Sequence, residues 1–387
     1  MSDIVLLDGA RTAHGSLLGG LSSLSAIELG TTTLDAVLDR TPLAPDAVDW
    51  VALGCAIQAG LGQVPARQAV VASRLSDGTP ATTINEASGS GLRAIALAAD
   101  RIEAGRAEVA LAGGMESMTN APYVLPDYRT GRRYGDATLV DSMIRDALWD
   151  ESYDAHMGEL TEELVEREGI PREAQDEYAL ESNRRAVEAV SAGRFDAEIV
   201  PVEAGGERVE TDEGPREDTS MERLAGLPPA FGSDGTITAG NASKLSDGAG
   251  CVALATADAA DDLGVDPLAR VVDYAVAYRD PKWFNVAVAD AVEELLAAND
   301  LAADDVALFE LNEAFAAQMV YVTERLGIPR DRLNTRGGAV AFGHPIGASG
   351  GMLATSLAYE MREADAQYGV VGMSIGGGGG IAMLLAR

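Results

Sequence analysis

Ser88 lies in a glycine-rich turn of the kind that exposes a nucleophile. The run from Asn85 to Arg93 reads Asn-Glu-Ala-Ser-Gly-Ser-Gly-Leu-Arg, which predicts a tight elbow between a short β-strand and a helix. Such an elbow presents its side chain outward, and the free N–H groups and partial positive charge of the helix N-terminus stabilise an anion there. A serine before a helix is also a common N-cap, and this segment alone leaves both interpretations open.

Three later segments carry an amide, an imidazole and a second hydroxyl. The segment 310–316 reads Glu-Leu-Asn-Glu-Ala-Phe-Ala and places Asn312 after a strand-like run. The segment 337–350 places His344, one of three histidines, in a glycine-framed turn between a strand-like run and a helix. Ser374 stands before a run of glycines near the C-terminus. A histidine can remove the proton of a hydroxyl nucleophile, and amide or backbone N–H groups can stabilise the resulting oxyanion.

In their order, these four segments resemble the thiolases, the family of acetyl-CoA acetyltransferases and 3-ketoacyl-CoA thiolases. The resemblance runs from Ile4 to Leu384, and the combination of Asn-Glu-Ala-Phe, Gly-His-Pro and a terminal glycine run makes it specific. Two positions depart from the family, which has its acyl-accepting cysteine at the position of Ser88 and an acid–base cysteine at that of Ser374. We therefore expect a thiolase with serine in place of the nucleophilic cysteine.

The resemblance implies a role for each polar group of the expected site. His344 activates the nucleophile, and together with a water held by Asn312 it forms one oxyanion pocket for the thioester carbonyl. The backbone N–H groups of Ser88 and Gly376 form the other pocket. His156 matches the second histidine position of the family.

The two serines change the expected energetics. A free cysteine is partly thiolate at neutral pH, whereas a serine hydroxyl needs a base during its attack. Ser374 is too weakly acidic to shuttle an α-proton as a thiol does, so His344 or His156 is expected to do that work. The only cysteines, Cys55 and Cys251, lie in apolar runs and are expected to be buried structural thiols. They offer no metal-binding spacing, and no permanent cofactor or metal is expected.

Coenzyme A would be the substrate carrier, and the resemblance implies where it binds. Ser243 matches the position that hydrogen-bonds the pantetheine arm. Four apolar residues match wall positions around that arm or the acyl group, with ordinary core packing as the alternative: Met157, Leu148, Phe231 and Phe315. Three arginines of one loop are the expected partners of the phosphates, with a contact between subunits as the alternative: Arg129, Arg132 and Arg133.

One departure affects the acyl pocket. Many thiolases have a Met-Gly-x-Gly-Pro segment there, whereas this chain has the segment 280–286 with Trp283 and Phe284. Two large aromatic side chains can narrow or reshape the pocket, and the sequence leaves the acyl length open.

The chain is strongly acidic, with 61 acidic residues against 29 basic ones and a formal net charge of -32. The acids are dispersed, which predicts an acidic surface adapted to high salt, as in a halophilic, haloarchaeal-like protein. At molar salt the Debye length is about 3 Å, so self-repulsion is screened. No basic stripe favours nucleic acid, and no signal peptide is recognisable, so a cytoplasmic protein is expected.

Other segments carry simpler expectations. The apolar stretch 369–386 is glycine-rich and predicts two buried strands around a turn rather than a membrane span. The acidic stretch from Glu203 to Asp218 predicts a solvated excursion, and His14 is expected on an exposed loop.

A repeated pattern predicts the α/β fold class. A helix from Ser90 to Ala104 precedes a strand at 108–114, and a helix from Ser349 to Glu363 precedes a strand at 368–372. The resemblance implies two such halves in a five-layered α/β/α/β/α body with an inserted loop domain that covers coenzyme A. The expected division is 1–117, 118–246 and 247–387.

The leading hypothesis is an acyl-CoA acyltransferase of the β-ketothiolase kind. It condenses acetyl-CoA with a short acyl-CoA, or cleaves a 3-ketoacyl-CoA, by a ping-pong route through Ser88. One alternative is a weakly active or non-catalytic acyl-CoA-binding subunit of a complex, and another is an acyl-CoA thioesterase. A homodimer or homotetramer is expected, with a small companion subunit as a further option.

Overall fold

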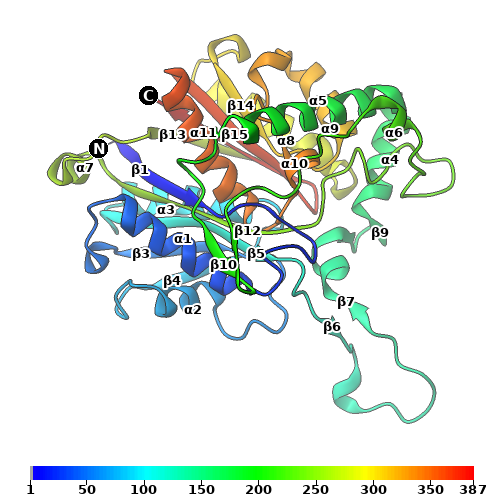
Figure 1. Cartoon of the computed structure of the whole chain (residues 1–387), viewed down its shortest axis with the longest axis horizontal. Helices are drawn as coiled ribbons and strands as arrows, with labels where there is room; N and C mark the ends of the chain where they lie inside the picture. The colour runs from blue at the N-terminus through cyan, green and yellow to red at the C-terminus, as the bar shows by residue number, and fades with distance from the viewer. Residues whose placement is uncertain (1–2) are drawn as a thin grey trace.

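The computed structural model describes residues 3–387; Met1 and Ser2, where the N-terminal half was predicted to begin, lie outside the described residues. Two halves follow similar orders of elements, except that the C-terminal half has the short helix α10 (Ala339–Phe342) where the N-terminal half has the strand β4 (Ala81–Ile84) (Figure 1). The N-terminal half contains β1 (Ile4–Arg11), α1 (Ala26–Arg40), β3 (Trp50–Gly54), α2 (Pro65–Ala72), β4 (Ala81–Ile84), α3 (Ser90–Glu103) and β5 (Val109–Ser117). The C-terminal half contains β13 (Ala269–Tyr278), α8 (Phe284–Ala298), β14 (Leu308–Leu311), α9 (Ala316–Leu326), α10 (Ala339–Phe342), α11 (Ser349–Ala364), β15 (Tyr368–Ile375) and β16 (Gly379–Ala386).

All the main strands belong to one ten-stranded sheet with the order β14-β15-β16-β13-β1-β12-β5-β3-β4, and β2 (Gly15–Ser16) pairs with β12 at its side. The two halves mirror each other outward from the β1–β13 junction, where only the first residues of β1 pair with β13. In each half an antiparallel pair is followed by parallel strands that a helix connects. The predicted duplication is therefore confirmed.

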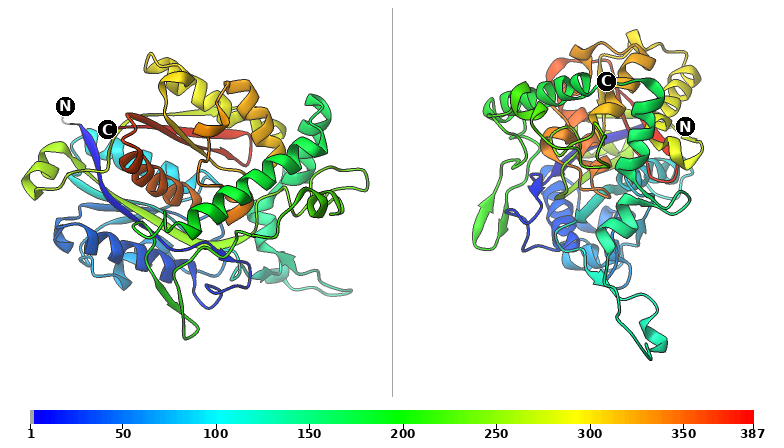
Figure 2. Two further views of the ribbon diagram at one scale, coloured as in Figure 1. Left: turned by 45° about the horizontal axis from the view of Figure 1, so that its top comes forward. Right: turned by 90° about the vertical axis from the view of Figure 1, so that its right-hand side faces the viewer.

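Three hydrophobic cores separate the layers. The first lies between α1 and the N-terminal strands, and the third lies between α8, α9 and the C-terminal strands. The middle core surrounds α3 and α11, which pack between the two halves, as the left view of Figure 2 shows for α11. Successive residues of β5 point alternately into two cores, Leu111 into the first and Ala112 into the middle one. These layers agree with the predicted five-layered body.

The strand β12 (Ser246–Thr256) lies on the far side of the predicted boundary at 247. It pairs with β1 on one edge and β5 on the other, so it completes the N-terminal half of the sheet. The predicted C-terminal half would separate this strand from both of its partners. We propose that the N-terminal half continues to Thr256.

Glycines let α3 and α11 touch at their N-terminal ends. A Cβ atom on Gly350 would lie 2.1 Å from the backbone nitrogen of Leu92, and one on Gly91 would lie 2.8 Å from that of Gly351. No side chain fits in this space, because real Cβ contacts are longer. The close crossing brings the turn before α3 and the turn before α11 together.

The inserted region between the halves consists of short elements and two longer helices. Its helices are α4 (Met157–Glu168), α5 (Arg172–Ser191) and α6 (Met221–Ala225), and α7 (Ala257–Leu263) follows β12. Its strands form three hairpin-like pairs: β6 (Tyr123–Val124) with β7 (Val140–Asp141), β8 (Trp149–Asp150) with β9 (Ala155–His156), and β10 (Val202–Ala204) with β11 (Glu207–Val209). The segment between β6 and β7 projects away from the body (Figure 1).

Two features are absent from residues 3–387. No helix among them has the length and apolar character needed to cross a bilayer. No three or more of their His, Cys, Asp and Glu side chains gather where a metal ion would be held.

Candidate active site

Ser88 lies on the elbow between β4 and α3, as the sequence predicted. Ala87 before it has a φ of 45°, a left-handed conformation that costs a non-glycine residue free energy. Ser90 at the start of α3 braces this backbone. Its hydroxyl donates to the carbonyl oxygen of Ala87 at 2.6 Å and accepts the backbone N–H of Glu86 at 2.9 Å. The hydroxyl of Ser88 is thereby left half-exposed and free to contact another element.

That element is the turn before α11. The Oγ atom of Ser88 lies 2.9 Å from Nε2 of His344. The other ring nitrogen, Nδ1, lies 2.6 Å from Oγ of Ser349, and Ser349 in turn donates to the carbonyl oxygen of Pro345 at 3.1 Å. Because Ser349 spends its only proton on Pro345, its oxygen accepts the proton of Nδ1. Nε2 then carries the lone pair and accepts the O–H of Ser88.

The electrostatic environment keeps this imidazole neutral. Burial, and secondly the nearby His14, lower the pKa of His344 to about 4. A neutral imidazole with its lone pair on the hydroxyl is the form that acts as a general base toward serine. A thiolate–imidazolium pair would instead require a protonated ring in this buried place.

Glu116 fixes the turn that carries His344. This fully buried carboxylate accepts the backbone N–H groups of Ala56 at 2.9 Å, Ile57 at 3.2 Å and Gly347 at 2.8 Å. It therefore joins the loop after β3 to the turn before α11. The buried thiol of Cys55 lies beside it and has its pKa raised by burial, so the predicted structural role of Cys55 is confirmed, as is that of the buried, unpaired Cys251.

Asn312 and Ser374 lie on the other sides of the site. The Nδ2 atom of Asn312, directly after β14, lies 3.4 Å from Nε2 of His344. Ser374, in β15, accepts a hydrogen bond of 3.2 Å from the side-chain amide of Gln318 in α9. Both residues are buried, and the Oε1 atom of Gln318 has no hydrogen-bond partner among the described residues. The amide donor leaves the proton of Ser374 free to point elsewhere.

His156 is held differently from His344. Its Nδ1 atom accepts the backbone N–H of Gly158 at 3.0 Å, and its ring stacks on Phe231 with centroids 4.7 Å apart. Nδ1 therefore carries the lone pair, and the neutral ring has its proton on Nε2. Burial lowers the pKa of His156, which favours this neutral form. His156 can donate a hydrogen bond, but its only basic nitrogen is occupied.

Gly376 faces the elbow and one apolar wall. A Cβ atom there would meet the Cβ of Ala87 at 3.7 Å and the sulfur of Met157 at 3.9 Å. Met157 packs with Phe315, Phe284 and Phe231 in one small cluster, so three of the four predicted wall residues are together. Phe284, from the segment 280–286 that differs from the thiolase pattern, packs in the same wall. Leu148 packs in a separate cluster with Ile57 and Ile346.

A cavity of about 700 Å³ opens beside Ser243. Its lining includes the basic residues Arg216, Arg223 and Lys244 as well as the acidic Asp218 and Glu222. Arg223 pairs with Asp218, whereas no carboxylate of the described chain forms an ion pair with Arg216. Burial and the charge of Arg216 lower the pKa of Lys244 to about 8. A phosphate-bearing ligand would find uncompensated positive charge here.

The arginines of the predicted phosphate site lie elsewhere. Arg129, Arg132 and Arg133 are exposed on the projecting segment between β6 and β7, and none of them lines the cavity beside Ser243 (Figure 1). Their role stays a prediction, and the contact between subunits is the interpretation that this position favours.

Known proteins with this fold and these motifs can now be compared. Residues 4–258 match the N-terminal domain of thiolase, and residues 265–387 match the C-terminal domain of thiolase. Over 392 residues the chain is 46% identical to an acetyl-CoA acetyltransferase of Pseudomonas aeruginosa and 45% identical to one of Cupriavidus necator, with 100% of each chain covered. The chain belongs to the thiolase family. A crystal structure of the Bacillus anthracis acetyl-CoA acetyltransferase matches this thiolase with a TM-score of 0.97 at 38% identity, covering 100% of this chain and 99% of the other.

Two expectations for this thiolase were wrong. His14 is buried rather than exposed, because its backbone N–H and its Nδ1 both contact Asp212 Oδ1, at 2.7 and 2.9 Å. The residues before His344 form the short helix α10 rather than a strand. The acidic stretch from Glu203 to Asp218 is mostly exposed, as predicted, but Asp212 within it is buried, because it forms an ion pair with Arg11.

Sequence reasoning also missed four residues of the site. Ser349 looked like an ordinary helix start, Gln318 like one polar residue within α9, and Glu116 like the end of a strand. Arg216 lies in the acidic stretch that was set aside as solvated. Only the Gly-His-Pro turn directly before Ser349 could have drawn attention to that residue.

Proposed function

We propose that this thiolase transfers acyl groups between acyl-CoA molecules through an acyl-Ser88 intermediate. The observation that carries the proposal is the 2.9 Å contact between Ser88 Oγ and the basic nitrogen of a neutral His344. Acetyl-CoA acetyltransferase is the activity named for the relatives above, which supports the proposal.

In the first half-reaction Ser88 attacks the thioester carbonyl while His344 takes its proton at Nε2. The backbone N–H groups of Ser88 and Gly376 stabilise the oxyanion, and the position of Gly376 against Ala87 of the elbow supports this role. When the carbon–sulfur bond breaks, His344 returns the proton to the sulfur of coenzyme A. The products are acetyl-Ser88 and free coenzyme A.

In the second half-reaction an α-proton of acetyl-CoA is removed and the enolate attacks the acetyl ester. Once Ser88 is acylated, Nε2 of His344 no longer accepts its hydroxyl proton but still carries the lone pair of the ring, so it takes this α-proton and returns it to Oγ of Ser88. The Asn312 amide, 3.4 Å from Nε2, and the proton of Ser374 are placed to stabilise the enolate oxygen. The reverse sequence cleaves a 3-ketoacyl-CoA.

The cavity beside Ser243 suits the pantetheine arm and phosphates of coenzyme A. Ser243 offers a hydroxyl to the arm, and the unpaired Arg216 offers a bidentate donor to phosphate. Phe284 at the wall with Met157 and Phe315 favours a short acyl group, because a phenyl ring there leaves little room beyond the elbow.

Intact-mass measurement after mixing with acetyl-CoA tests the proposal. We expect one added acetyl group, mapped to the peptide that contains Ser88 and absent in Ser88→Ala. The matched control, Ser374→Ala, should still be acetylated. Rapid loss of the acetyl group to water without a ketoacyl product would indicate a thioesterase. Unchanged turnover in Ser88→Ala would contradict the proposal and move the chemistry elsewhere.

We further propose that the enzyme is a halophilic, cytoplasmic homo-oligomer. The charge of -32 supports adaptation to salt, and β4 at the end of the sheet supports pairing with a second copy. The projecting segment supports a further contact, since Tyr134 there is 97% exposed. Circular dichroism that is unchanged between molar KCl and low salt would contradict the adaptation to salt. A monomer in light scattering would contradict the homo-oligomer.

A further inference from the structure

A small internal cavity lies against the catalytic imidazole. Its volume is about 30 Å³, and its lining includes Asn312 and Ser349, whose side chains contact the ring nitrogens of His344. Glu310, Arg11 and Arg336 contribute charged groups to the same lining. A cavity of this volume has room for one or two water molecules, and the polar groups of its lining could bind them.

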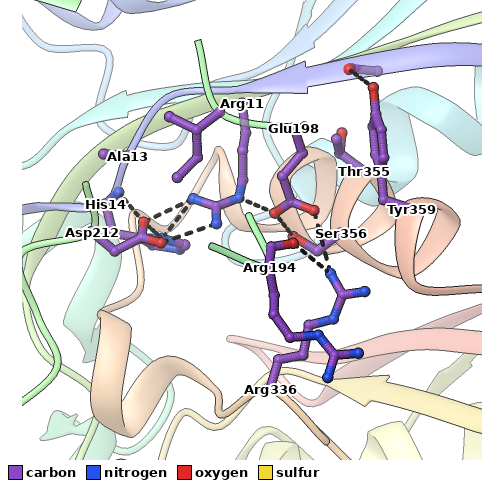
Figure 3. A network of polar contacts seen from close by, with 12 residues as sticks. Arg11, Ala13, His14, Arg194, Glu198, Asp212, Arg336, Thr355, Ser356 and Tyr359 are labelled. Carbon is purple, nitrogen blue, oxygen red and sulfur yellow. Dashed lines mark hydrogen bonds and ion pairs between the residues drawn. The ribbon is translucent and has the colours of Figure 1, made fainter. Parts of the chain in front are cut away.

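The walls of this cavity belong to a buried ion network (Figure 3). Arg11 binds Asp212 through two nitrogens, at 2.8 and 3.0 Å, and Glu198 at 2.5 Å. Ser356, which also lines the cavity, donates to Glu198 at 2.6 Å. The Oε2 atom of Glu198 and the Nε atom of Arg336 are buried without a hydrogen-bond partner among the described residues. Buried orphan atoms of this kind are normally satisfied by ordered water.

Glu310, at the third position of β14, contributes a carboxyl group to the lining and has no role in the mechanism above. Four charged groups face it from other elements, namely Glu360 of α11, Arg336, Glu313 and Glu198, and Arg11 and His14 lie across the cavity. Burial, followed by the charge of Glu360, raises the pKa of Glu310 well above its ordinary value. A carboxyl group shifted in this direction exchanges protons closer to neutral pH.

We propose that Glu310 is a proton store for His344, connected to it through Ser349 and water in the cavity. The inference rests on the proposed acyl-Ser88 mechanism and extends it to the far side of the ring. Glu310 touches no substrate. It is a positioning residue that acts only through His344, by accepting and returning the proton of the ring.

Each transfer along this path is balanced. When Nε2 of His344 takes the proton of Ser88, Nδ1 passes its own proton to Oγ of Ser349. The hydroxyl proton of Ser349 leaves the carbonyl oxygen of Pro345 and passes to the water, and the water protonates the carboxylate of Glu310. The ring stays neutral throughout. The reverse sequence returns a proton through Nε2 to the sulfur of the leaving coenzyme A, and Glu310 is ionised again.

Such a proton store compensates for the two serines, since Ser88 needs a base to become a nucleophile and Ser374 is too weak an acid to shuttle a proton. A ring whose pKa is lowered to about 4 is a weak base if it must hold the proton itself. Passing the charge to a carboxylate avoids a buried imidazolium, and Ser374 then does not need to act as an acid. The path requires Glu310 to be ionised at the start, so the acylation rate should rise as pH rises through the raised pKa of Glu310.

The test is the rate of Ser88 acetylation by acetyl-CoA, followed by rapid quenching and intact mass between about pH 5 and about pH 9 at molar KCl. In Glu310→Gln we expect the rate at high pH to fall by about 10²-fold, within the range for lost proton transfer. The remaining pH dependence should move down toward the pKa of His344, about 4. Ser356→Ala is the matched control, because it changes the same cavity wall and should keep the wild-type pH profile.

A double-mutant comparison keeps the test valid if Glu310→Gln is poorly stable. Ser349→Ala cuts the same path closer to the ring, so Ser349→Ala and the double variant should lose the same rate. Additive losses, or a wild-type pH profile in Glu310→Gln, would overturn the proton store while acetyl-Ser88 still formed. Absence of acetyl-Ser88 in the wild type would instead overturn the mechanism on which the inference rests.

Discussion

The turns before α3 and α11 occupy equivalent places in the two halves, yet they serve different chemistry. Each helix begins with a buried serine, Ser90 in one case and Ser349 in the other. Ser90 uses both hydrogen-bonding capacities on backbone groups of its own elbow. Ser349 binds one backbone carbonyl and turns its oxygen toward the ring of His344. The serine at the start of each helix thus has a different partner. Ser90 orients the nucleophile through the backbone of its elbow, and Ser349 orients the base through the imidazole ring.

The ion pairs near the two turns also differ in how deeply they are buried. The ion pair beside Ser88 joins Glu86 to Arg93, with side chains 18% and 19% exposed. The pairs behind His344 join Arg11 to Asp212 and Glu198, and none of these side chains is more than 1% exposed. A nucleophile must meet substrate, whereas a base gains from a buried site that keeps it neutral. Burial, rather than sequence pattern, separates the two roles.

Removing the base should have the largest effect. His344→Ala is expected to slow acetylation of Ser88 by about 10²- to 10⁴-fold, because a hydroxyl without a base is a poor nucleophile. His156→Ala is the matched control, and it should leave acetylation of Ser88 close to the wild-type rate, because the basic nitrogen of His156 is occupied by Gly158. Rapid-quench mass spectrometry measures both rates. An equal loss of acetylation in both variants would contradict the division of labour between the histidines.

Breaking the ion pair beside each turn should lower the unfolding free energy by different amounts. Asp212→Asn leaves Arg11 without its bidentate partner and is expected to cost about 3–5 kcal/mol in unfolding free energy. Glu86→Gln, in the partly exposed pair, should cost about 1 kcal/mol or less. Denaturant titrations at molar KCl compare the two. Similar costs would show that the buried network is not what distinguishes the second turn.

The pH dependence of the Asp212 effect has a definite sign. The charge of Arg11 and the hydrogen bonds of His14 overcome burial and hold the pKa of Asp212 far below its ordinary 3.8. A carboxylate with a depressed pKa stabilises the fold above its unfolded value and loses that contribution as pH falls. The difference between wild type and Asp212→Asn should therefore be constant near neutral pH and shrink below about pH 4.

Replacing the two equivalent serines by alanine should lower kcat in one case and stability in the other. Ser349→Ala removes the acceptor of Nδ1 and is expected to lower kcat by roughly 10- to 100-fold with KM for acetyl-CoA unchanged. Ser90→Ala orphans the backbone N–H of Glu86 and should cost about 1–3 kcal/mol in stability. Steady-state kinetics and thermal unfolding, measured on both variants, check the assignment. A stability loss confined to Ser349→Ala would reverse it.

The contrast between local and distant contacts explains what the sequence could predict. The helices at 90–103 and 349–364 and the strands after them follow from local pattern, and the glycine turns placed Ser88, His344 and Asn312 in one site. The partner of His14 lies 198 residues away, so no periodicity could reveal that both are buried. The ring-binding role of Ser349 was hidden for another reason. Serine at a helix start is common, and only the three-dimensional position of the ring distinguishes this one.

The smallest effect concerns the second serine of the site, away from both turns. Ser374 accepts the amide of Gln318, and a thiol at this position would accept that bond more weakly but would be a far better acid. Ser374→Cys should raise the rate of condensation by roughly tenfold, which corresponds to about 1.4 kcal/mol, and should leave acetylation of Ser88 unchanged. Gln318→Met, which removes the amide donor, is the companion variant, and it should reduce condensation in wild type more than in Ser374→Cys. A faster first half-reaction in Ser374→Cys would mean that residue 374 also acts on the nucleophile, and the separation between the two half-reactions would not hold.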